Sequence, residues 1–448
     1  MRLLGFWTYP PPNDGLPEVR ARIREDVLRM VNDYKDEPGV LFWILGNENN
    51  YSFDRNVNPW STEEVEKIKD PMEKRAAKAR IYYSFVNELA KEIKEADPNR
   101  PPRGVYNDID CFILDQIVEA AEKHGIYLEL CLLTRDHYME PLSHPNTAAY
   151  DRAVADAKKL LRYCVARWGY STHVAAWEYW NEMDPGPPNQ LLYGAWGEHL
   201  EQIDPYRHLR AVSHWHPSPK YWQHPKLDMA DEHFYMRPST KELFRDAPLA
   251  VMDRAALLRK HAPSKPALIS EFGILEDNWR PTEHLKKDKE FWHLHNALWA
   301  SALSGLSGTV MHWFWDDIHK RDFYHHYKPV AAYVADIPFT TAKLRPAAAT
   351  ASDPKVRVIG LQGDGCAYLW LFNSQATWWK LGDGLTPDQI EGMTVVLKGI
   401  ATGSYQVEWW DTAKGAVTKK EAARASSKGI RLTAPPFSRD IACKVTSR

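Results

Sequence analysis

Short apolar runs alternate with amphipathic stretches over the first three quarters of the chain. Eight of the runs have the length and the aromatic or β-branched content of buried strands, and turn residues follow them. These predicted strands cover residues 3–9, 39–48, 126–133, 174–182, 207–214, 227–235, 267–271 and 309–315. Strands that alternate with helices favour parallel pairing, so the pattern predicts an α/β fold of the (β/α)8 TIM-barrel type.

The stretches between the runs have a helical period. Residues 151–168 show it most clearly, with apolar side chains at Ala157, Leu161, Cys164 and Trp168. Asp70 is expected to cap a further helix. The predicted helices are 17–34, 71–96, 109–124, 151–168, 189–203 and 282–303.

The pattern changes after residue 342. Residues 343–354 are rich in Ala, Thr, Ser and Pro, which is typical of a linker. Beyond it, short alternating runs predict strands at 356–360, 366–372, 393–397, 404–410, 429–433 and 440–445. We therefore expect a barrel domain at 1–342 and a small β-sandwich at 355–448, with a bracing role favoured over glycan binding for the sandwich.

Two predicted strands end in a glutamate. Residues 174–182 end in Asn181-Glu182, and 267–271 ends in Glu271, after which Gly273 is expected to permit a turn. In a parallel barrel, the carboxyl ends of all strands open on one face. Two carboxyl groups about 5 to 5.5 Å apart carry out retaining glycoside hydrolysis, in which one protonates the leaving oxygen and the other attacks the anomeric carbon.

At these residues the sequence resembles the retaining glycoside hydrolases of clan A, including family 5. In that clan Asn-Glu closes the fourth strand and a Glu closes the seventh, and Glu182 and Glu271 are likewise three predicted strands apart. The resemblance implies that Glu182 is the acid/base, Glu271 the nucleophile and Asn181 the partner of the sugar 2-hydroxyl. It also implies a β-linked oligo- or polysaccharide as substrate, with no cofactor and no metal.

The resemblance extends to the sixth and eighth predicted strands. His233-Phe-Tyr235 is similar to the His-x-Tyr of the clan, whose Tyr donates to the nucleophile and would lower the pKa of Glu271. Trp313 and Trp315 alternate to one side, like the tryptophan beneath the sugar in the clan, and Trp315 is expected nearer the mouth. Further candidates for contacts with the sugar are His214, Arg135 and His137.

The first hundred residues contain a second copy of the acid/base signature. Residues 39–48 end in Asn47-Glu48 and resemble the fourth-strand motif of family 2 glycosidases. Relatives usually place an Arg on the second strand, and 39–48 contains none, which suggests that 1–100 and 101–342 differ in origin. Two alternatives therefore stand beside a retaining β-glycosidase: an inactive carbohydrate-binding barrel of chimeric origin, and an enzyme whose acid is Glu48.

Composition adds limits to this interpretation. The chain has 448 residues, is 44% hydrophobic and has a formal net charge of -2, which gives no indication of nucleic-acid or membrane partners. Its 19 Trp residues suit a cleft that stacks sugar rings, although core packing must account for most of them. The 5 Cys residues are scattered and are expected to be buried free thiols.

No secretory signal is visible at the start of the sequence, and no apolar run reaches membrane-spanning length. We therefore expect a cytoplasmic protein, or a secreted one whose leader is absent from this sequence.

Overall fold

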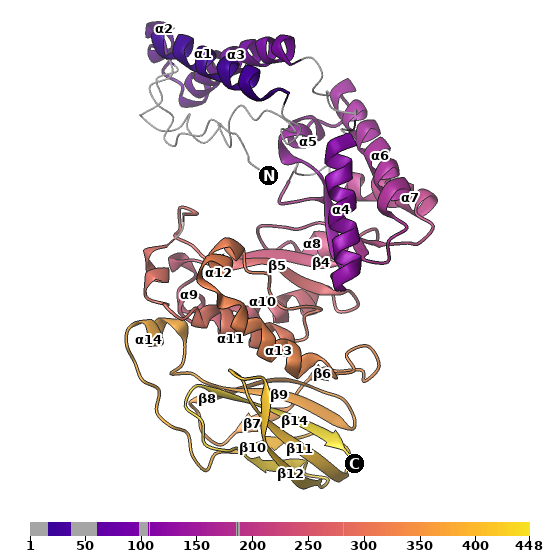
Figure 1. Cartoon of the computed structure of the whole chain (residues 1–448), viewed down its shortest axis with the longest axis vertical. Helices are drawn as coiled ribbons and strands as arrows, with labels where there is room; N and C mark the ends of the chain where they lie inside the picture. The colour runs from indigo at the N-terminus through magenta and orange to yellow at the C-terminus, as the bar shows by residue number, and fades with distance from the viewer. Residues whose placement is uncertain are drawn as a thin grey trace. The chain divides into compact units, whose positions relative to one another are not determined.

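The computed structural model describes residues 17–36, 61–97, 106, 108–184, 186, 189–280 and 282–448 (Figure 1). The chain divides into two compact units, Met1–Tyr127 and Leu128–Arg448. The strands predicted at 3–9 and 39–48 lie outside the described residues, and so do Asn47 and Glu48.

The described part of the first unit is helical. Its helices are α1 (Pro17–Tyr34), α2 (Glu63–Glu66), α3 (Pro71–Ala96) and α4 (Asp108–His124). The side chain of Asp70 accepts hydrogen bonds from two backbone N–H groups of α3, so the predicted cap is confirmed. Val27 and Val31 of α1 pack against Ile93 of α3. Gly125 follows α4 with a φ of 66°, the left-handed conformation of a helix stop.

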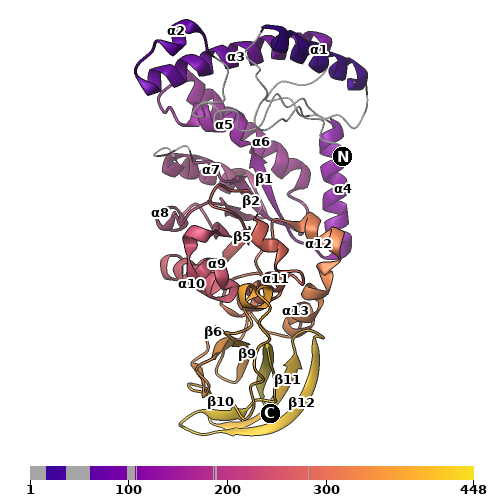
Figure 2. The same ribbon diagram turned by 90° about the vertical axis from the view of Figure 1, so that its left-hand side faces the viewer.

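The second unit begins with strands that alternate with helices (Figure 2). The strands of this α/β part are β1 (Leu128–Leu133), β2 (Val174–Trp180), β3 (Leu209–Ala211), β4 (Ala230–Met236) and β5 (Ala267–Ile274). The α-helices of this part are α5 (Arg135–Leu142), α6 (Ala148–Trp168), α7 (Asn189–Ile203), α8 (Pro219–Trp222), α9 (Glu242–Arg245), α10 (Ala247–His261), α11 (Trp292–Leu303), α12 (Trp315–Arg321) and α13 (Tyr327–Val334). The predicted strands and helices between residues 126 and 274 are therefore confirmed, with shifts at their ends.

The strands form two parallel sheets, in the orders β1-β2-β3 and β4-β5. The backbone links them, because His233 N on β4 donates to His214 O after β3 at 2.8 Å. Beyond β5, Phe272 N donates to Met311 O at 2.8 Å and Trp313 N donates to Phe272 O at 2.9 Å. The described strands thus follow one another in chain order.

The strand predicted at 309–315 is reduced to a single parallel bridge between Phe272 and His312. Helix α12 already begins at Trp315, because Asp316 and Asp317 favour the first turn of a helix. No closed ring of strands is found within the described ranges, since two of the eight predicted strands lie outside them and this one contributes only a bridge.

Gly273 has a different role from the predicted one. It lies inside β5 and not in a turn. A Cβ atom at this position would lie 3.1 Å from the ring of Phe314 and 3.4 Å from the ring of Tyr235. The glycine is therefore needed for the close approach of these two rings and not for backbone freedom.

The chain ends in two antiparallel sheets. Their orders are β12-β11-β14-β9-β8-β6 and β13-β10-β7. The elements are β6 (Arg345–Pro346), β7 (Ala349–Ala351), β8 (Val356–Gln362), β9 (Cys366–Asn373), α14 (Trp378–Gly382), β10 (Thr394–Leu397), β11 (Gly403–Asp411), β12 (Ala416–Ala425), β13 (Ile430–Thr433) and β14 (Asp440–Ser447). All six predicted strands are present, and β12 was missed because its exposed, charged positions at a sheet edge carry no apolar alternation.

The prediction of a linker at 343–354 is wrong. Strand β6 pairs with β8, and β7 pairs with β10, so this segment contributes to both sheets. Short edge strands bury few side chains, and their composition resembles that of a loop.

One hydrophobic core joins the α/β part to the six-stranded sheet. Helix α11 lies between β5 and β9 in Figures 1 and 2, and its Leu298 and Trp299 belong to the same buried cluster as Trp370 and Phe372 of β9. Across this core, Tyr333 of α13 donates to a backbone carbonyl of β14. The continuity of the core supports the bracing role expected for the C-terminal sheets.

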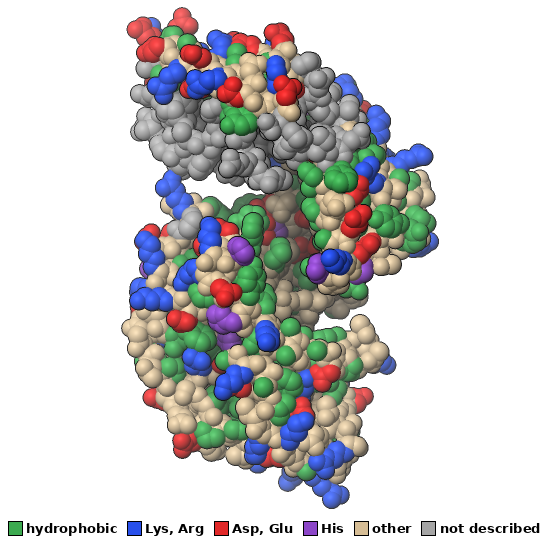
Figure 3. Space-filling view, viewed as in Figure 1, with side chains coloured by type: hydrophobic (Ala, Val, Ile, Leu, Met, Phe, Trp, Pro, Cys, Tyr) green, Lys and Arg blue, Asp and Glu red, His purple; other side chains and the backbone are tan. Residues whose placement is uncertain are grey.

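The surface and the cysteines complete the fold. Lysine and arginine side chains are interspersed with aspartate and glutamate on the face of the second unit seen in Figure 3. None of the five cysteines forms a disulfide, but Cys131 is exposed and Cys366 partly exposed, so the prediction of burial is wrong for these two. Cys131 lies on an edge strand of its described sheet. Among the described residues, no helix has both the length and the apolar character needed to cross a bilayer.

Candidate active site

The carboxyl ends of the parallel strands bring together residues that are far apart in the sequence. Glu182 follows β2, His233 lies on β4 and Glu271 lies on β5. One oxygen of each carboxylate and Nδ1 of His233 lie within 4.8 Å of one another. His233 Nδ1 is 2.6 Å from Glu182 Oε1 and 3.2 Å from Glu271 Oε2. The imidazole therefore bridges the two predicted acidic groups.

Glu271 is buried and hydrogen-bonded. The hydroxyl of Tyr235 donates to Glu271 Oε2 at 2.5 Å, as the sequence predicts. Burial nevertheless raises the pKa of Glu271, and the opposing effects of His233 and Tyr235 do not outweigh it. The hydrogen bond from Tyr235 lowers the pKa as expected, but the net shift is upward, because the cost of removing the carboxylate from water is the larger effect.

Glu182 has a strained backbone. Its φ is 48°, in the left-handed region that residues with a Cβ atom seldom adopt. Its N–H donates to Ser213 Oγ at 3.3 Å, and the Ser213 hydroxyl lies 2.5 Å from Glu178 Oε1. Its side chain is 25% exposed, compared with 9% for Glu271. Of the two carboxylates, Glu182 is thus the more accessible to an incoming ligand.

His233 lies in a strongly negative environment. Burial on its own would lower the pKa of His233, but the hydrogen bond to Glu182 and the charges of Glu271 and Asp231 raise it on balance. These neighbours therefore stabilise the protonated form of the imidazole relative to that of an isolated histidine.

Further buried carboxyl groups adjoin the site, and the sequence analysis missed them. Burial raises the pKa of Glu178 to about 7, and burial together with Asp231 and Glu178 raises the pKa of Glu129 to about 9. Asp231 is buried and accepts a hydrogen bond from Ser270 Oγ at 2.6 Å. Each of these residues is an acidic position inside an apolar predicted strand, which is a signal that could have identified them.

The other predicted residues take varied positions. Asn181 is exposed, and its Oδ1 lies 3.4 Å from Ser213 Oγ. His214 is buried, stacks on Tyr221 and has a pKa lowered to about 4, chiefly by burial. With this low pKa the imidazole is neutral near pH 7, and its Nε2 lies 3.4 Å from the hydroxyl of Tyr193. Trp313 is exposed, and Trp315 is the first residue of α12. Arg135 is exposed in α5, and the side chain of His137 lies outside the described part.

Glu182, His233 and Glu271 are also the described residues that could hold a divalent cation, by donor type and spacing. Hydrogen bonds already satisfy the facing atoms of the three groups.

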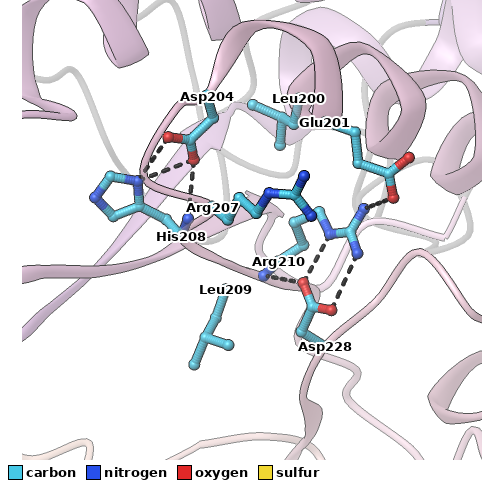
Figure 4. Close-up of a pocket in the computed structure, with 8 residues that line it drawn as sticks. All are labelled: Leu200, Glu201, Asp204, Arg207, His208, Leu209, Arg210 and Asp228. Atoms are coloured by element: carbon cyan, nitrogen blue, oxygen red, sulfur yellow. Dashed lines mark hydrogen bonds and ion pairs between the residues drawn. The ribbon is translucent and has the colours of Figure 1, made fainter.

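A pocket lies at the other end of β3, away from Glu182 and Glu271. This pocket has a volume of about 200 Å³ (Figure 4). In it, His208 faces Asp204, and Arg210 lies between Glu201 and Asp228. Since Arg210 is bound on both sides by carboxylates, these residues form a structural network.

Comparisons with known proteins identify the fold. No protein-family model and no curated protein matches the chain. A solved structure described as "Glycoside hydrolase" matches with a TM-score of 0.53 and 16% identity, covering 78% of this chain and 79% of that one. A glycoside hydrolase of family 5 from Bacteroides vulgatus ATCC 8482 matches with a TM-score of 0.50 and 14% identity, covering 95% and 86%. At these identities the similarity is one of fold, and that fold is shared with TIM-barrel glycoside hydrolases.

Proposed function

We propose that the chain is a retaining β-glycosidase that hydrolyses β-linked glycans by double displacement. The observation that carries the proposal is the distance of at most 4.8 Å between facing oxygens of Glu182 and Glu271. Retaining enzymes hold their two carboxyl groups about 5 to 5.5 Å apart, whereas inverting enzymes leave about 6.5 to 9.5 Å for a water molecule. The short separation therefore favours the retaining reaction, and the fold shared with glycoside hydrolases supports it.

In the proposed first step, Glu271 attacks the anomeric carbon through a carboxylate oxygen. The glycosidic C–O bond breaks, and the proton of Glu182 passes to the leaving oxygen. In the second step, Glu182 takes a proton from water, which attacks the same carbon and releases Glu271. Tyr235 and His233 orient Glu271, since both contact its Oε2.

The remaining parts of the proposal concern the substrate and the fold. Asn181 contacts the 2-hydroxyl of the bound sugar, and Trp313 or Trp315 lies beneath its ring. The described strands belong to a (β/α)8 barrel at 1–342, in which residues 1–100 supply the first two strands and have a separate origin. A sandwich domain follows at 355–448, and the reaction needs no cofactor.

The test is hydrolysis of a panel of nitrophenyl β-glycosides and soluble β-glycans. Glu182→Gln and Glu271→Gln should each lower the rate by about a thousandfold or more, because each removes a group that takes part in bond making or breaking. Glu283→Gln is the matched control, since this glutamate is exposed and pairs with Lys286 on the surface. The first sugar released should have the β configuration when observed by NMR.

Three results would contradict the proposal. Release of the α anomer would show inversion. Loss of activity in Glu48→Gln with an active Glu182→Gln variant would make Glu48 the acid. An inactive parent chain that still binds oligosaccharides would favour the carbohydrate-binding barrel of chimeric origin.

A further inference from the structure

Two half-exposed tryptophans and an arginine lie beside the carboxylate pair. Trp215 follows β3, Arg237 directly follows the last residue of β4 and Trp279 follows β5. Trp215 is 47% exposed and Trp279 is 45% exposed, although most of the described tryptophans are buried. We call these three residues the tryptophan wall.

Tyr235 connects the tryptophan wall to Glu271. The ring centroids of Trp279 and Tyr235 are 6.2 Å apart with the rings nearly perpendicular, and Tyr235 is the residue that donates to Glu271. Trp215 and Trp279 also meet edge to face, with centroids 6.2 Å apart. A ring stacked on the wall would therefore be a neighbour of the sugar held at Glu271.

The loop that carries Trp279 is held in place. Trp279 has a φ of 65°, a left-handed conformation that is strained for a bulky residue. Backbone hydrogen bonds between Glu276 and Arg280 and between Trp279 and Glu276 close the turn, and Asp277 accepts from the N–H of Ser239. Strain that is maintained by surrounding contacts is a common property of ligand-binding segments.

Arg237 supplies hydrogen-bond donors to the same place. It lies on the same side of β4 as His233 and Tyr235, since the three are two residues apart. Its guanidinium lies 4.1 Å from the ring centroid of Trp279, over one face of the indole. Its Nε is buried and has no hydrogen-bond partner among the described residues. A guanidinium keeps its charge and has five N–H donors, and the Arg237 side chain is only partly buried, so its donors can reach an oxygen atom of a ligand.

We propose that the tryptophan wall is a second sugar-binding subsite. A pyranose ring stacks its C–H face on the exposed indoles, and Arg237 donates to an oxygen of that ring, either a hydroxyl or a carboxylate. The substrate is then an oligosaccharide or polysaccharide of at least two rings. This inference rests on the proposed function, because the first ring occupies Glu182 and Glu271.

The test compares a substrate that cannot reach the wall with one that can. A monosaccharide β-glycosyl fluoride has a leaving group without a ring, whereas an unmodified di- or trisaccharide must place a second ring somewhere. Trp279→Ala should lower kcat/KM for the oligosaccharide about 10- to 100-fold, the effect of exposing one aromatic contact to water, and change that for the fluoride by less than about threefold. Trp279→Phe should retain most of the oligosaccharide rate, because it keeps a flat ring.

Tyr206→Ala is the control, because Tyr206 is an exposed aromatic residue next to His208 at the other end of β3. Equal losses on both substrates in Trp279→Ala would overturn the inference and leave Trp279 a structural residue. Unchanged rates on both would overturn it as well.

Arg237→Gln distinguishes the two kinds of ring oxygen. A loss at least about tenfold larger for uronate-containing than for neutral oligosaccharides identifies a carboxylate, and equal losses identify a hydroxyl. No loss on either substrate would remove Arg237 from the subsite.

Failure of the proposed function is a separate outcome, since the parent chain would then hydrolyse neither the fluoride nor the oligosaccharide. Quenching of tryptophan fluorescence by the oligosaccharide, lost in Trp279→Ala, would still support the subsite in that case, and quenching that persists would contradict it.

Discussion

Glu271 shows how burial and hydrogen bonding compete at one carboxyl group. Burial raises its pKa, and the hydroxyl of Tyr235 partly opposes that change by stabilising the charged form. A nucleophile must be ionised, so activity should fall as the pH drops through this raised pKa. The acidic limb of the pH–rate profile is therefore expected at a higher pH than the pKa of an ordinary glutamate.

Tyr235→Phe tests this balance. The change removes a hydrogen bond to a charged group, which should lower kcat/KM about 10- to 100-fold. It should also move the acidic limb of kcat/KM to higher pH, because the loss of the donor leaves burial less opposed. A pH profile that keeps its acidic limb in place while the rate falls would mean that Tyr235 does not act on the ionisation of Glu271.

Glu178 provides a second prediction, on stability. Burial raises its pKa from the 4.5 of an unperturbed glutamate to about 7, so the folded state holds this proton more tightly than the unfolded state. The resulting contribution to stability is complete below pH 4.5 and is lost as the pH rises through about 7.

Glu178→Gln keeps an oxygen that can accept from Ser213 and cannot ionise. The free energy of unfolding of the parent should therefore fall relative to that of the variant between pH 5 and 8, by up to about 3 kcal/mol. Chemical denaturation at several pH values measures this difference. Parallel pH dependences would show that Glu178 is already ionised in the folded protein at pH 5.

At the scale of elements, β5 carries both a reacting group and the glycine that lets its neighbours approach. Gly273→Ala would place a Cβ atom 3.1 Å from Phe314 and 3.4 Å from Tyr235. The variant should lose about 1 to 3 kcal/mol of stability through overpacking. Its activity should fall too, since Tyr235 must move while it holds Glu271.

Gly194→Ala is the matched control for this prediction. Gly194 lies in α7, and a Cβ atom there would have no neighbour within 4 Å. The same substitution should therefore stabilise the protein by about 0.5 to 1 kcal/mol, because alanine favours a helix. Equal effects of the two changes on thermal unfolding would contradict the packing argument for Gly273.

The elements that could be predicted are those with a strong local pattern. The strand at 174–182 is rich in aromatic and small apolar residues and ends before a turn, and the structure places β2 there. Strand β12 and the segment at 343–354 could not be predicted, since their pairing depends on partners elsewhere in the sheets. The convergence of Glu182 and Glu271 followed from the rule that parallel strands open on one face. The direction of the pKa shift at Glu271 did not, because it depends on burial that sequence patterns do not measure.

At the scale of the whole second unit, the C-terminal sheets share their core with the α/β part. Trp299 of α11 and Trp370 of β9 are both fully buried and stack at 6.4 Å between ring centroids. Trp370→Ala should therefore lower the free energy of unfolding by about 3 to 5 kcal/mol. Activity and fluorescence should still be lost in one thermal transition, at a lower temperature than in the parent.

Removal of residues 343–448 extends the same argument. It would expose the face of α11 and α13 that packs on the sheet, and the shortened chain should aggregate or unfold. A soluble 1–342 fragment with the melting temperature of the parent would show that the sheets are an independent domain.

The left-handed backbone of Glu182 has a consequence for how this protein has been selected. Glycine adopts that conformation without strain, so Glu182→Gly should melt at a higher temperature than the parent while losing its activity. A screen for thermal stability alone would thus select inactive variants at residue 182. Glutamate at residue 182 is therefore explained by function and not by stability. Differential scanning calorimetry of the parent and of Glu182→Gly would measure how much stability the glutamate costs.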